Sequence, residues 1–255
     1  MRWIYLSPHL DDVVLSCGAI VWQQVQAGHK VEIWSIFAGD PPEGDLPPFA
    51  LTLHERWQTG PQAYAVRRAE DRAACAVLGA QARHLHFADC IYRRLPSGEP
   101  LIAENEQLFA PLHAQEAPLL QEISDLLAAY LPRNAMLISP LSIGGHVDHR
   151  LVRAAAERLG RRLGYYADYP YAITRPTQVG SQAAGRARHF PLPPPALQAW
   201  MDAIACHVSQ LSTFWPSEAA MRQELQAYAA QGGGQTLWFQ PCQRTIYKNH
   251  HQNSP

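Results

Sequence analysis

The sequence predicts an α/β fold built on a mostly parallel sheet with helices on both faces. Short apolar runs that suit buried parallel strands alternate with helical patterns through the first two thirds of the chain. Two of these strands also run directly into turns that contain His and Asp and open a helix. Because open α/β sheets place their ligands at the carboxyl ends of the strands, we expect a polar site at this edge.

The first strand and helix meet at the stretch Ser7-Pro8-His9-Leu10-Asp11-Asp12. An apolar run over residues 3–6 suits a central strand. This pattern places His9 and Asp12 at the end of the strand, beside the free N–H groups and the positive dipole end of the helix. The apolar residues that recur at helical spacing after Asp12 are Val14, Cys17, Val21 and Val25.

The next units repeat this alternation. Gly28 ends the first helix, and residues 30–38 predict a second strand. Residues 39–61 then form a loop that is too long to be a simple connector. A helix is predicted over residues 65–78 and a third strand over residues 83–87.

A second long loop, residues 88–117, would lie on the same edge of a parallel sheet as the first junction. An amphipathic helix over residues 119–130 and a fourth strand over residues 135–139 then lead into the second polar stretch. That stretch reads Gly144-Gly145-His146-Val147-Asp148-His149. A further helix and a fifth strand over residues 163–167 end the predicted core.

The pattern changes after Asp168. Prolines, aromatic residues and a Gly- and Ala-rich turn predict a small irregular or antiparallel addition. Helices are predicted within it over residues 193–206 and 218–230. We expect a single domain over residues 1–255, with a core at about 1–167 and a C-terminal α+β addition at about 168–248.

Composition and charge narrow the class of protein. Apolar residues make up 47% and charged residues 17% of the 255, so the chain is predicted to be globular and not disordered. The net charge is -1 and no basic stripe is present, which argues against a nucleic-acid partner.

We expect a cytoplasmic protein without a membrane span. No stretch approaches the roughly 20 apolar residues of a membrane helix, and the N-terminus lacks the pattern of a signal peptide. The cysteines never form a CxxC pair, so we interpret them as reduced thiols and not as a disulfide frame or a Cys-rich zinc site. They are Cys17, Cys75, Cys90, Cys206 and Cys242.

Metal-binding side chains lie at the ends of two different strands. His9 and Asp12 can face one point above the sheet, and His149 can approach that point from the other turn. Two imidazoles and one carboxylate leave one coordination position open, as in the catalytic zinc sites that hold a water. We therefore predict Zn²⁺ at these three residues, with another divalent metal such as Fe²⁺ as the alternative.

Acid–base groups lie next to the predicted ligands. Asp11 is free to point away from the metal, so we predict that it is the general base. His146 is placed to stabilise an oxyanion or protonate a leaving amine, and Asp148 is predicted to hold its ring and favour its protonated form. A single Asp before a helix is more often an N-cap. Because HxDD and HxDH both close a strand and open a helix here, the catalytic interpretation is favoured.

These residues resemble the LmbE-like, or PIG-L, family of metal-dependent de-N-acetylases. The resemblance rests on Ser7-Pro8-His9-Leu10-Asp11-Asp12 followed by Gly18, and on His146-Val147-Asp148-His149. Two weaker traits are Arg67-x-x-Glu70 and Ser209-Gln210. The resemblance therefore spans about residues 3 to 210.

The resemblance implies a Rossmann-like α/β fold with zinc bound by His9, Asp12 and His149. It also implies that Asp11 is the base and that His146, oriented by Asp148, is the acid that faces the oxyanion. Family members typically remove acetyl groups from N-acetylglucosamine-type sugars attached to a variety of other groups.

The sequence departs from the family pattern at three positions. Leu10 and Val147 stand where many members have proline, which should affect loop rigidity more than chemistry. Gly144 stands where some relatives carry a tyrosine that touches the substrate carbonyl. We expect that role to be unfilled, or to be filled by another residue such as Tyr92 or Tyr169.

Residues that recognise the substrate are less clearly marked. Arg67 is a candidate, but a salt bridge with Glu70 on the same helix is an equally good interpretation. Residues of the long loops offer aromatic faces and cationic donors that suit a sugar with a polar or anionic aglycone. They are Trp57, Tyr92, Arg93 and Arg94.

The predicted function is that of a zinc-dependent N-deacetylase, an amide hydrolase acting on a small-molecule amino-sugar conjugate. The alternative is a non-catalytic sugar- or nucleotide-binding module on the same fold, although the absence of GxGxxG argues against a dinucleotide. The presence of Asp11 and His146 favours the enzyme. Three aromatic residues are interpreted as core or as the surface of a homo-oligomer, namely Trp200, Phe214 and Trp215.

Overall fold

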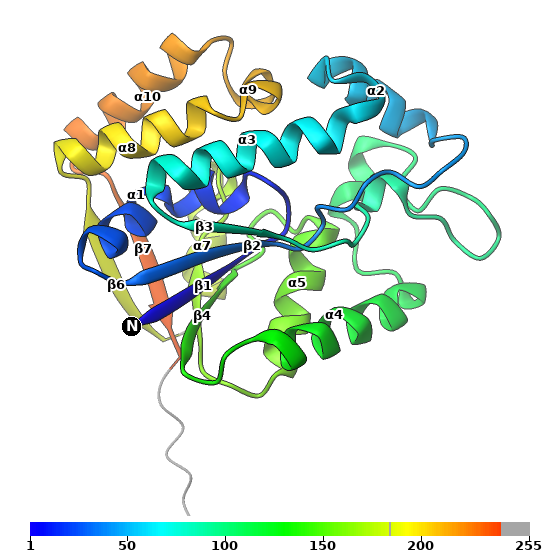
Figure 1. Ribbon diagram of the computed structural model, residues 1–255, viewed down its shortest axis with the longest axis horizontal. Coiled ribbons are helices and arrows are strands. Elements are labelled where there is room, and N and C mark those ends of the chain that lie inside the picture. The colour runs from blue at the N-terminus through cyan, green and yellow to red at the C-terminus, as the bar shows by residue number, and fades with distance from the viewer. Residues whose placement is uncertain (184, 241–255) are drawn as a thin grey trace, which may run out of the picture.

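Seven strands form one sheet (Figure 1). They are β1 Arg2–Ser7, β2 Lys30–Ser35, β3 Gln81–His84, β4 Ala135–Pro140, β5 Leu163–Tyr166, β6 Arg186–Pro191 and β7 Gly234–Phe239. The computed structural model describes residues 1–183 and 185–240 of the chain. The order across the sheet is β3-β2-β1-β4-β5-β7-β6, in which β1 to β5 pair in parallel and β7 runs antiparallel to β5 and β6. The predicted, mostly parallel α/β sheet is confirmed.

β1 lies inside the sheet and has no solvent-facing side. Ile4, Tyr5 and Leu6 are completely buried, because helices cover both faces of the sheet. Tyr5 is in register with Ile33 of β2 and Ile138 of β4. The sequence of a strand that is buried on both faces is a continuous apolar run. The apolar run over residues 3–6 predicted this strand for that reason.

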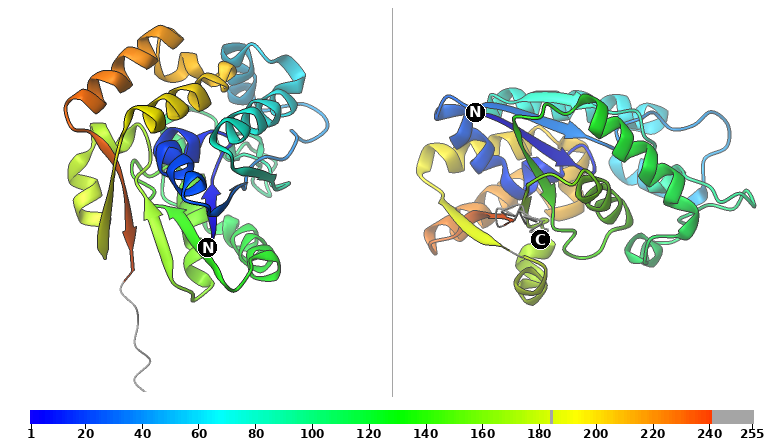
Figure 2. Two further views of the ribbon diagram at one scale, coloured as in Figure 1. Left: turned by 60° about the vertical axis from the view of Figure 1, so that its left-hand side comes forward. Right: turned by 90° about the horizontal axis from the view of Figure 1, so that it is seen from below.

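Two layers of helices pack on the sheet (Figures 1 and 2). Apolar side chains of α1 Asp12–Gln26, α3 Ala63–Leu78 and α8 Pro194–Ala205 join one core cluster, and those of α4 Ala117–Tyr130 and α5 Val147–Arg158 join another. α9 Val208–Phe214 and α10 Glu218–Ala230 contact α8. Two short helices, α6 Tyr171–Thr174 and α7 Pro176–Gln182, lie between β5 and β6 in the chain. Trp200 and Trp215 are each 3% exposed, so their interpretation as core residues is confirmed.

The two long loops contain helical turns that the sequence did not predict. The first contains α2 Pro48–Trp57 and the 3-10 turn η1 Gly60–Gln62. Its prolines favour a loop, but proline also suits the first position of a helix, where Pro48 lies. The second contains three further 3-10 turns, η2 Cys90–Tyr92, η3 Asn105–Phe109 and η4 Ala114–Glu116.

The third strand ends earlier than predicted, at His84 instead of Phe87. After His84 the chain leaves the parallel ladder, and Phe37 and His86 form an isolated antiparallel bridge. The apolar residues that extended the prediction, Leu85 and Phe87, instead join the core cluster that also contains residues of α4 and α5.

Three expectations concern the whole chain. No helix in the described ranges is long and apolar enough to cross a membrane. Within the same ranges, Cys17, Cys75, Cys90 and Cys206 are free thiols, whereas Cys242 lies outside the described residues. The last part of the predicted C-terminal addition, residues 241–248, also lies outside them.

Candidate metal and catalytic site

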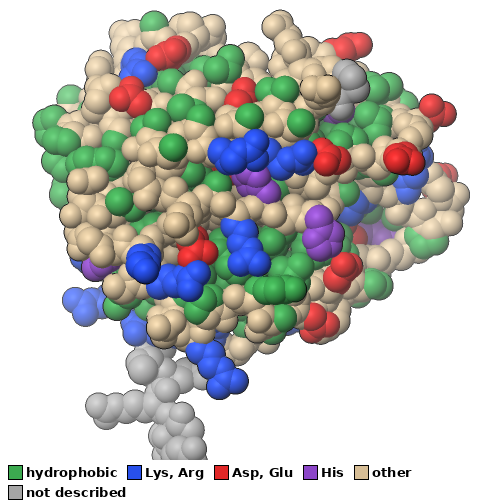
Figure 3. Space-filling model, viewed as in Figure 1, with side chains coloured by type: hydrophobic (Ala, Val, Ile, Leu, Met, Phe, Trp, Pro, Cys, Tyr) green, Lys and Arg blue, Asp and Glu red, His purple; other side chains and the backbone are tan. Residues whose placement is uncertain are grey.

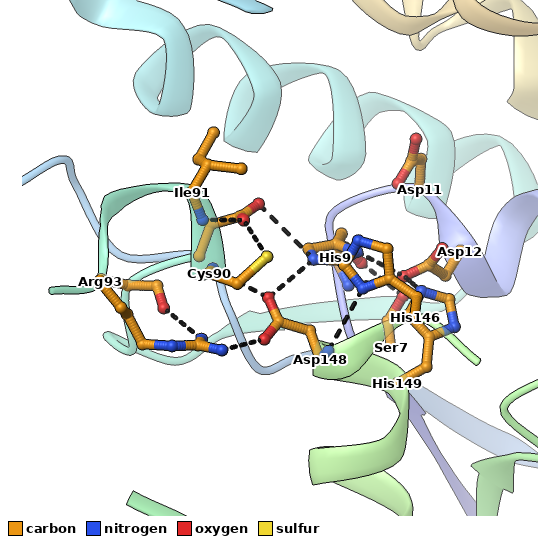
Figure 4. Close-up of polar contacts among 12 residues, drawn as sticks. Ser7, His9, Asp11, Asp12, Cys90, Ile91, Arg93, His146, Asp148 and His149 are labelled. Carbon is orange, nitrogen blue, oxygen red and sulfur yellow. Dashed lines mark hydrogen bonds and ion pairs between the residues drawn. The ribbon is translucent and has the colours of Figure 1, made fainter. Parts of the chain in front are cut away.

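The candidate site lies at the carboxyl edge of the sheet, where the strand order reverses between β1 and β4. Crevices at such a reversal are the usual ligand sites of open α/β sheets. α1 and α5 leave these strands toward opposite faces, so the turns that precede the two helices open toward each other. The structure thereby brings together the two polar stretches of the sequence, as Figure 4 shows.

His9, Asp12 and His149 present one ligand atom each to a common point. Oδ2 of Asp12 lies 3.2 Å from Nδ1 of His9 and 3.3 Å from Nε2 of His149. The backbone N–H of His9 holds the Asp12 carboxylate in place through a 2.7 Å hydrogen bond. Two imidazole nitrogens and one carboxylate oxygen form a donor set that suits zinc and leaves a coordination position open.

The electrostatics of the site also fit a cation. Despite burial, Asp12 and Asp168 raise the pKa of His149 to about 10. Asp89, Asp12 and Asp148 likewise raise the pKa of His9 against the effect of burial. Excess carboxylates around two imidazoles favour a positive charge between them, and a divalent metal supplies one.

The ring nitrogens that face away from this point are each held by a second carboxylate. Nδ1 of His149 lies 2.6 Å from Oδ1 of Asp168, and Nε2 of His9 lies 3.1 Å from Oδ2 of Asp148. Such outer carboxylates fix the tautomer and the orientation of metal-binding histidines. Asp168 was not predicted as a site residue, although its place directly after β5, at the same edge of the sheet, is a signal that could have identified it.

Asp148 does not hold the ring of His146, which corrects the sequence prediction. Its carboxylate instead accepts hydrogen bonds from Arg93 at 2.5 Å and from the backbone N–H of Cys90 at 3.0 Å, besides the contact with His9. The reason is local, because His146 is the N-cap of α5 and its Nδ1 accepts the backbone N–H of Asp148 at 3.2 Å. Although burial opposes it, Arg93 keeps the pKa of Asp148 below its usual range.

His146 lies against both candidate imidazole ligands. Its ring centroid is 5.0 Å from that of His9 and 5.1 Å from that of His149. Burial, together with the positive charge of the two neighbouring rings, lowers the pKa of His146 to about 3. The ring is therefore neutral near pH 7, in contrast to the predicted protonated form. Because Nδ1 accepts a backbone N–H, the ring proton is assigned to Nε2, where it can be donated to a developing oxyanion.

Asp11 is buried but does not act as a helix cap. It occupies the N-cap position of α1, yet its side chain makes no capping hydrogen bond. Its Oδ1 lies 3.5 Å from Nη2 of Arg67 instead. Burial raises the pKa of Asp11 to about 6, although Arg67 acts in the opposite direction. A carboxylate with a pKa close to neutrality suits a general base.

Arg67 faces Asp11 and not Glu70. Its guanidinium lies 4.8 Å from the ring centroid of Trp57 and 5.2 Å from that of Tyr64. Glu70 instead accepts hydrogen bonds from the backbone N–H of Ser209 at 2.8 Å and from its hydroxyl at 2.6 Å. The predicted salt bridge within α3 is therefore replaced by a bond that ties α3 to α9.

Neither tyrosine that was considered for the role missing at Gly144 faces the metal point. The hydroxyl of Tyr92 bonds His54, and that of Tyr169 donates to Glu224. A Cβ atom at Gly144 would instead lie 2.5 Å from Cγ of Tyr171, so the ring of Tyr171 occupies the space beside this glycine. Tyr171 was not predicted as a site residue, although it lies close after β5 at the same edge of the sheet.

The loop residues that were expected to hold a polar or anionic aglycone make contacts within the protein. Trp57 and Tyr92 are 7% and 2% exposed. The guanidinium of Arg93 contacts Asp148 and lies 2.8 Å from Glu116. That of Arg94 donates to the backbone carbonyls of Gly98 and Asp45, both at 2.9 Å. All four side chains therefore make structural contacts within the protein.

Comparisons with known proteins agree with this arrangement. Residues 4–159 match the PIG-L family, described as GlcNAc-PI de-N-acetylase. The 2'-N-acetylparomamine deacetylase of Niallia circulans is 32% identical over 186 residues, which cover 66% of this chain and 67% of that protein. The enzyme of the same name from Streptomyces fradiae is 28% identical over 180 residues, which cover 68% of this chain and 59% of that protein.

Solved structures give the same picture over almost the whole chain. The zinc-inhibited form of teicoplanin deacetylase Orf2 superposes with a TM-score of 0.78 at 30% identity, covering 94% of this chain and 97% of that one. The A40926 pseudoaglycone deacetylase Dbv21 superposes with a TM-score of 0.67 at 31% identity, covering 93% and 96%.

Proposed function

The chain belongs to the PIG-L family of de-N-acetylases, and from this premise we propose that it is a metal-dependent hydrolase of N-acyl amino sugars. The proposed reaction removes an acetyl or other acyl group from the nitrogen of an amino sugar or of an N-acetylglucosaminyl conjugate. The observation that carries the proposal is the open set of two imidazoles and one carboxylate, with Asp11 and His146 beside it.

We propose zinc as the metal, held by His9, Asp12 and His149, with Fe²⁺ as the alternative divalent ion. A bound zinc supplies Lewis acidity toward a carbonyl oxygen and lowers the pKa of a coordinated water. Asp148 and Asp168 would keep each imidazole in the tautomer that presents the correct nitrogen.

The side chains of this protein would carry the proton transfers. Asp11 accepts a proton from the attacking water as the new C–O bond forms at the amide carbon. Nε2 of His146 donates a hydrogen bond to the oxyanion that develops on the former carbonyl oxygen. The C–N bond then breaks, and the departing amine takes the proton held by Asp11, so acetate and the free amino sugar leave. Arg67 positions the Asp11 carboxylate between these two transfers.

The alternative function, a sugar- or nucleotide-binding module without catalysis, fits less well. A binding module would not need a buried carboxylate that is neither a helix cap nor fully paired, yet Asp11 is such a group. Metal-loaded protein that released no acetate from any glycoside tested would favour the binding module.

Replacing Asp11 by Asn tests the proposed mechanism, because Asn keeps the size of the side chain but removes its basicity. We expect Asp11→Asn to lower kcat by about 10²–10⁴ while zinc is retained, the usual range for a positioned proton transfer. The readout is acetate released from N-acetylglucosaminides, with zinc content measured on the same sample. Glu218→Gln, on the exposed start of α10, is the matched control. Parental kcat in zinc-loaded Asp11→Asn protein would assign the base to another residue.

A further inference from the structure

Two segments that border the site carry only negative charge. Residues 39–55 and 95–117 contain no Lys or Arg, although the net charge of the whole chain is only -1. Arg94 ties the two segments together through the carbonyls of Asp45 and Gly98. Their carboxylates belong to Asp40, Glu43, Asp45, Glu55, Glu99, Glu104, Glu106 and Glu116.

The second of these segments contacts the catalytic histidine directly. The ring centroid of Phe109, the last residue of η3, lies 5.9 Å from that of His146. Glu104 and Glu106, at the start of η3, are exposed, and within residues 1–183 and 185–240 they form no ion pair. Figure 3 shows Asp and Glu side chains on the right-hand part of this face, where the two segments lie in Figure 1.

A hollow of about 520 Å³ opens within the same segment. Its wall includes Val147, which lies between His146 and Asp148, and the side chains of Leu101, His113 and Glu116. Glu116 is 6% exposed, and its Oε1 lies 2.8 Å from Nη2 of Arg93. In the described part of the chain, its Oε2 has no partner. A buried carboxylate oxygen without a partner is costly, so it favours a ligand that donates to it.

We propose that this hollow and its acidic border form a subsite for a protonated amine, so that the preferred substrates carry an ammonium group on the part joined to the N-acyl sugar. The inference rests on the proposed function, since the subsite is defined by its place beside His146. It also narrows the expectation of a polar or anionic aglycone, because Arg93, one of the two cationic donors that supported that expectation, is paired with Asp148 and Glu116.

The charge preference can be measured with three glycosides of N-acetylglucosamine that differ only in the aglycone. The aglycones are 4-aminocyclohexyl, cyclohexyl and 4-carboxycyclohexyl, which are cationic, neutral and anionic at neutral pH. We expect kcat/KM to fall in that order, by roughly tenfold per step at low salt, since a cleft of one sign raises the local concentration of the opposite charge. Salt at about 1 M should remove most of the difference at the exposed border, because the Debye length is then only about 3 Å.

Two sets of variants locate the effect. Glu116→Gln should reduce the preference for the cationic over the neutral glycoside several-fold, measured as the ratio of their kcat/KM values. Glu104→Gln with Glu106→Gln should reduce the same preference and its dependence on salt, as border charges usually do. Both residues of this pair are exposed, so the double variant still decides the matter if Glu116→Gln does not fold. Asp202→Asn with Glu218→Gln, on α8 and α10, removes two carboxylates elsewhere and should change nothing.

Binding measured without turnover separates the subsite from the hydrolase. The dissociation constants of the same three glycosides are measured by calorimetry with the Asp11→Asn protein. Equal affinities, or a preference for the anionic glycoside, would overturn the subsite even if all three were hydrolysed by the parent. Selective binding of the cationic glycoside without acetate release from the parent would support the subsite and overturn only the proposed function.

Discussion

At the scale of single residues, the site depends on how each imidazole uses both of its nitrogens. His9 and His149 each direct one ring nitrogen to Asp12 and the other to a second buried carboxylate. A neutral imidazole carries only one N–H, so a carboxylate that accepts this hydrogen leaves the other nitrogen free to bind a metal. Asp148 and Asp168 are therefore expected to affect the metal without touching it.

Replacing Asp168 by Asn tests this role. The amide keeps the shape of the side chain but removes the negative charge beside Nδ1 of His149, so we expect the affinity for zinc to fall by about 10–100-fold. Competition with a chelator measures the affinity directly. Asp71→Asn is the matched control, because Asp71 is equally buried and lies 2.7 Å from Nε2 of His84, so it pairs with a histidine that is not a predicted ligand. Equal loss of affinity in both variants would mean that only general stability had changed.

His207 should make the stability of the protein depend on pH. It is 2% exposed, its Nε2 has no hydrogen-bond partner among residues 1–183 and 185–240, and burial lowers its pKa from 6.5 to about 3. Between these values the unfolded chain binds a proton that the native protein does not, so stability falls as the pH drops from 6.5 toward 3. From about pH 7.5 to about pH 5 this group alone should cost about 2 kcal/mol.

His207→Leu removes the group that titrates and should flatten this dependence by the same amount. Equilibrium unfolding in urea at the two pH values, with parent and variant at equal metal content, measures the difference. His86→Gln is the control, since the side chain of His86 is 72% exposed. A variant that kept the full pH dependence of the parent would show that other groups cause it.

The candidate metal ligands were predictable because strand ends place them, whereas their partners were not. His9, Asp12 and His149 follow apolar strands at short spacing, and the sheet brings such ends together. The direction of the Asp148 side chain depends instead on Arg93, which comes from a distant loop. Asp168 was missed because no second polar residue next to it marked the end of β5 as functional.

At the scale of elements, the contact of α1 with α8 positions the first polar turn. Nε1 of Trp200 in α8 donates a 2.8 Å hydrogen bond to the carbonyl of Val14, and a Cβ atom at Gly18 would lie 2.8 Å from Cδ1 of Trp200. The backbone of α1 also departs from helical geometry at Cys17. The glycine therefore allows the close approach that fixes the start of α1 over the sheet.

Gly18→Ala should consequently weaken the protein. The added methyl group would overpack the contact between α1 and α8, so we expect a loss of about 1–3 kcal/mol in the free energy of unfolding. Chemical denaturation gives this quantity. Gly180→Ala in α7 is the control, because a Cβ atom there would meet nothing within 4 Å and alanine is the better helix former. A neutral or stabilising Gly18→Ala would show that Trp200 moves aside without cost.

Helices and strands with a strong apolar pattern in the sequence were predictable. Those whose formation depends on contacts with distant segments were not. The parallel strands and helices of the core follow apolar patterns that burial imposes on both faces. α2 begins with prolines, and its apolar residues pack on the loop between β3 and α4 and not on the sheet. The antiparallel pair of β6 and β7 joins segments more than 40 residues apart, and its edge strand is mostly exposed.

At the scale of the whole molecule, one sheet continues from β3 to β6 and supports the site from below. The C-terminal strands extend the sheet formed by the first five, and α8 packs on α1 and α3. We propose on these grounds that the chain is a single domain. The metal point lies above the carboxyl edge of this sheet, outside the core clusters that cover its two faces.

Removal of the metal should therefore leave the fold intact. Zinc binding adds stability only through mass action, about 4 kcal/mol when zinc exceeds its dissociation constant 1,000-fold, and neither core cluster includes His9, Asp12 or His149. We expect protein treated with a chelator to keep its circular dichroism spectrum and to melt cooperatively at a lower temperature.

His9→Ala, Asp12→Ala and His149→Ala should each lose zinc and behave like the chelated parent, because each removes one of the three converging ligand atoms. Elemental analysis of the purified variants measures the loss, and Asp71→Asn again serves as the control that keeps its metal. Full zinc occupancy in one of the three variants would remove that residue from the ligand set. Unfolding of the parent on chelation at room temperature would instead mean that the metal is part of the fold, as in small zinc domains that have no core of their own.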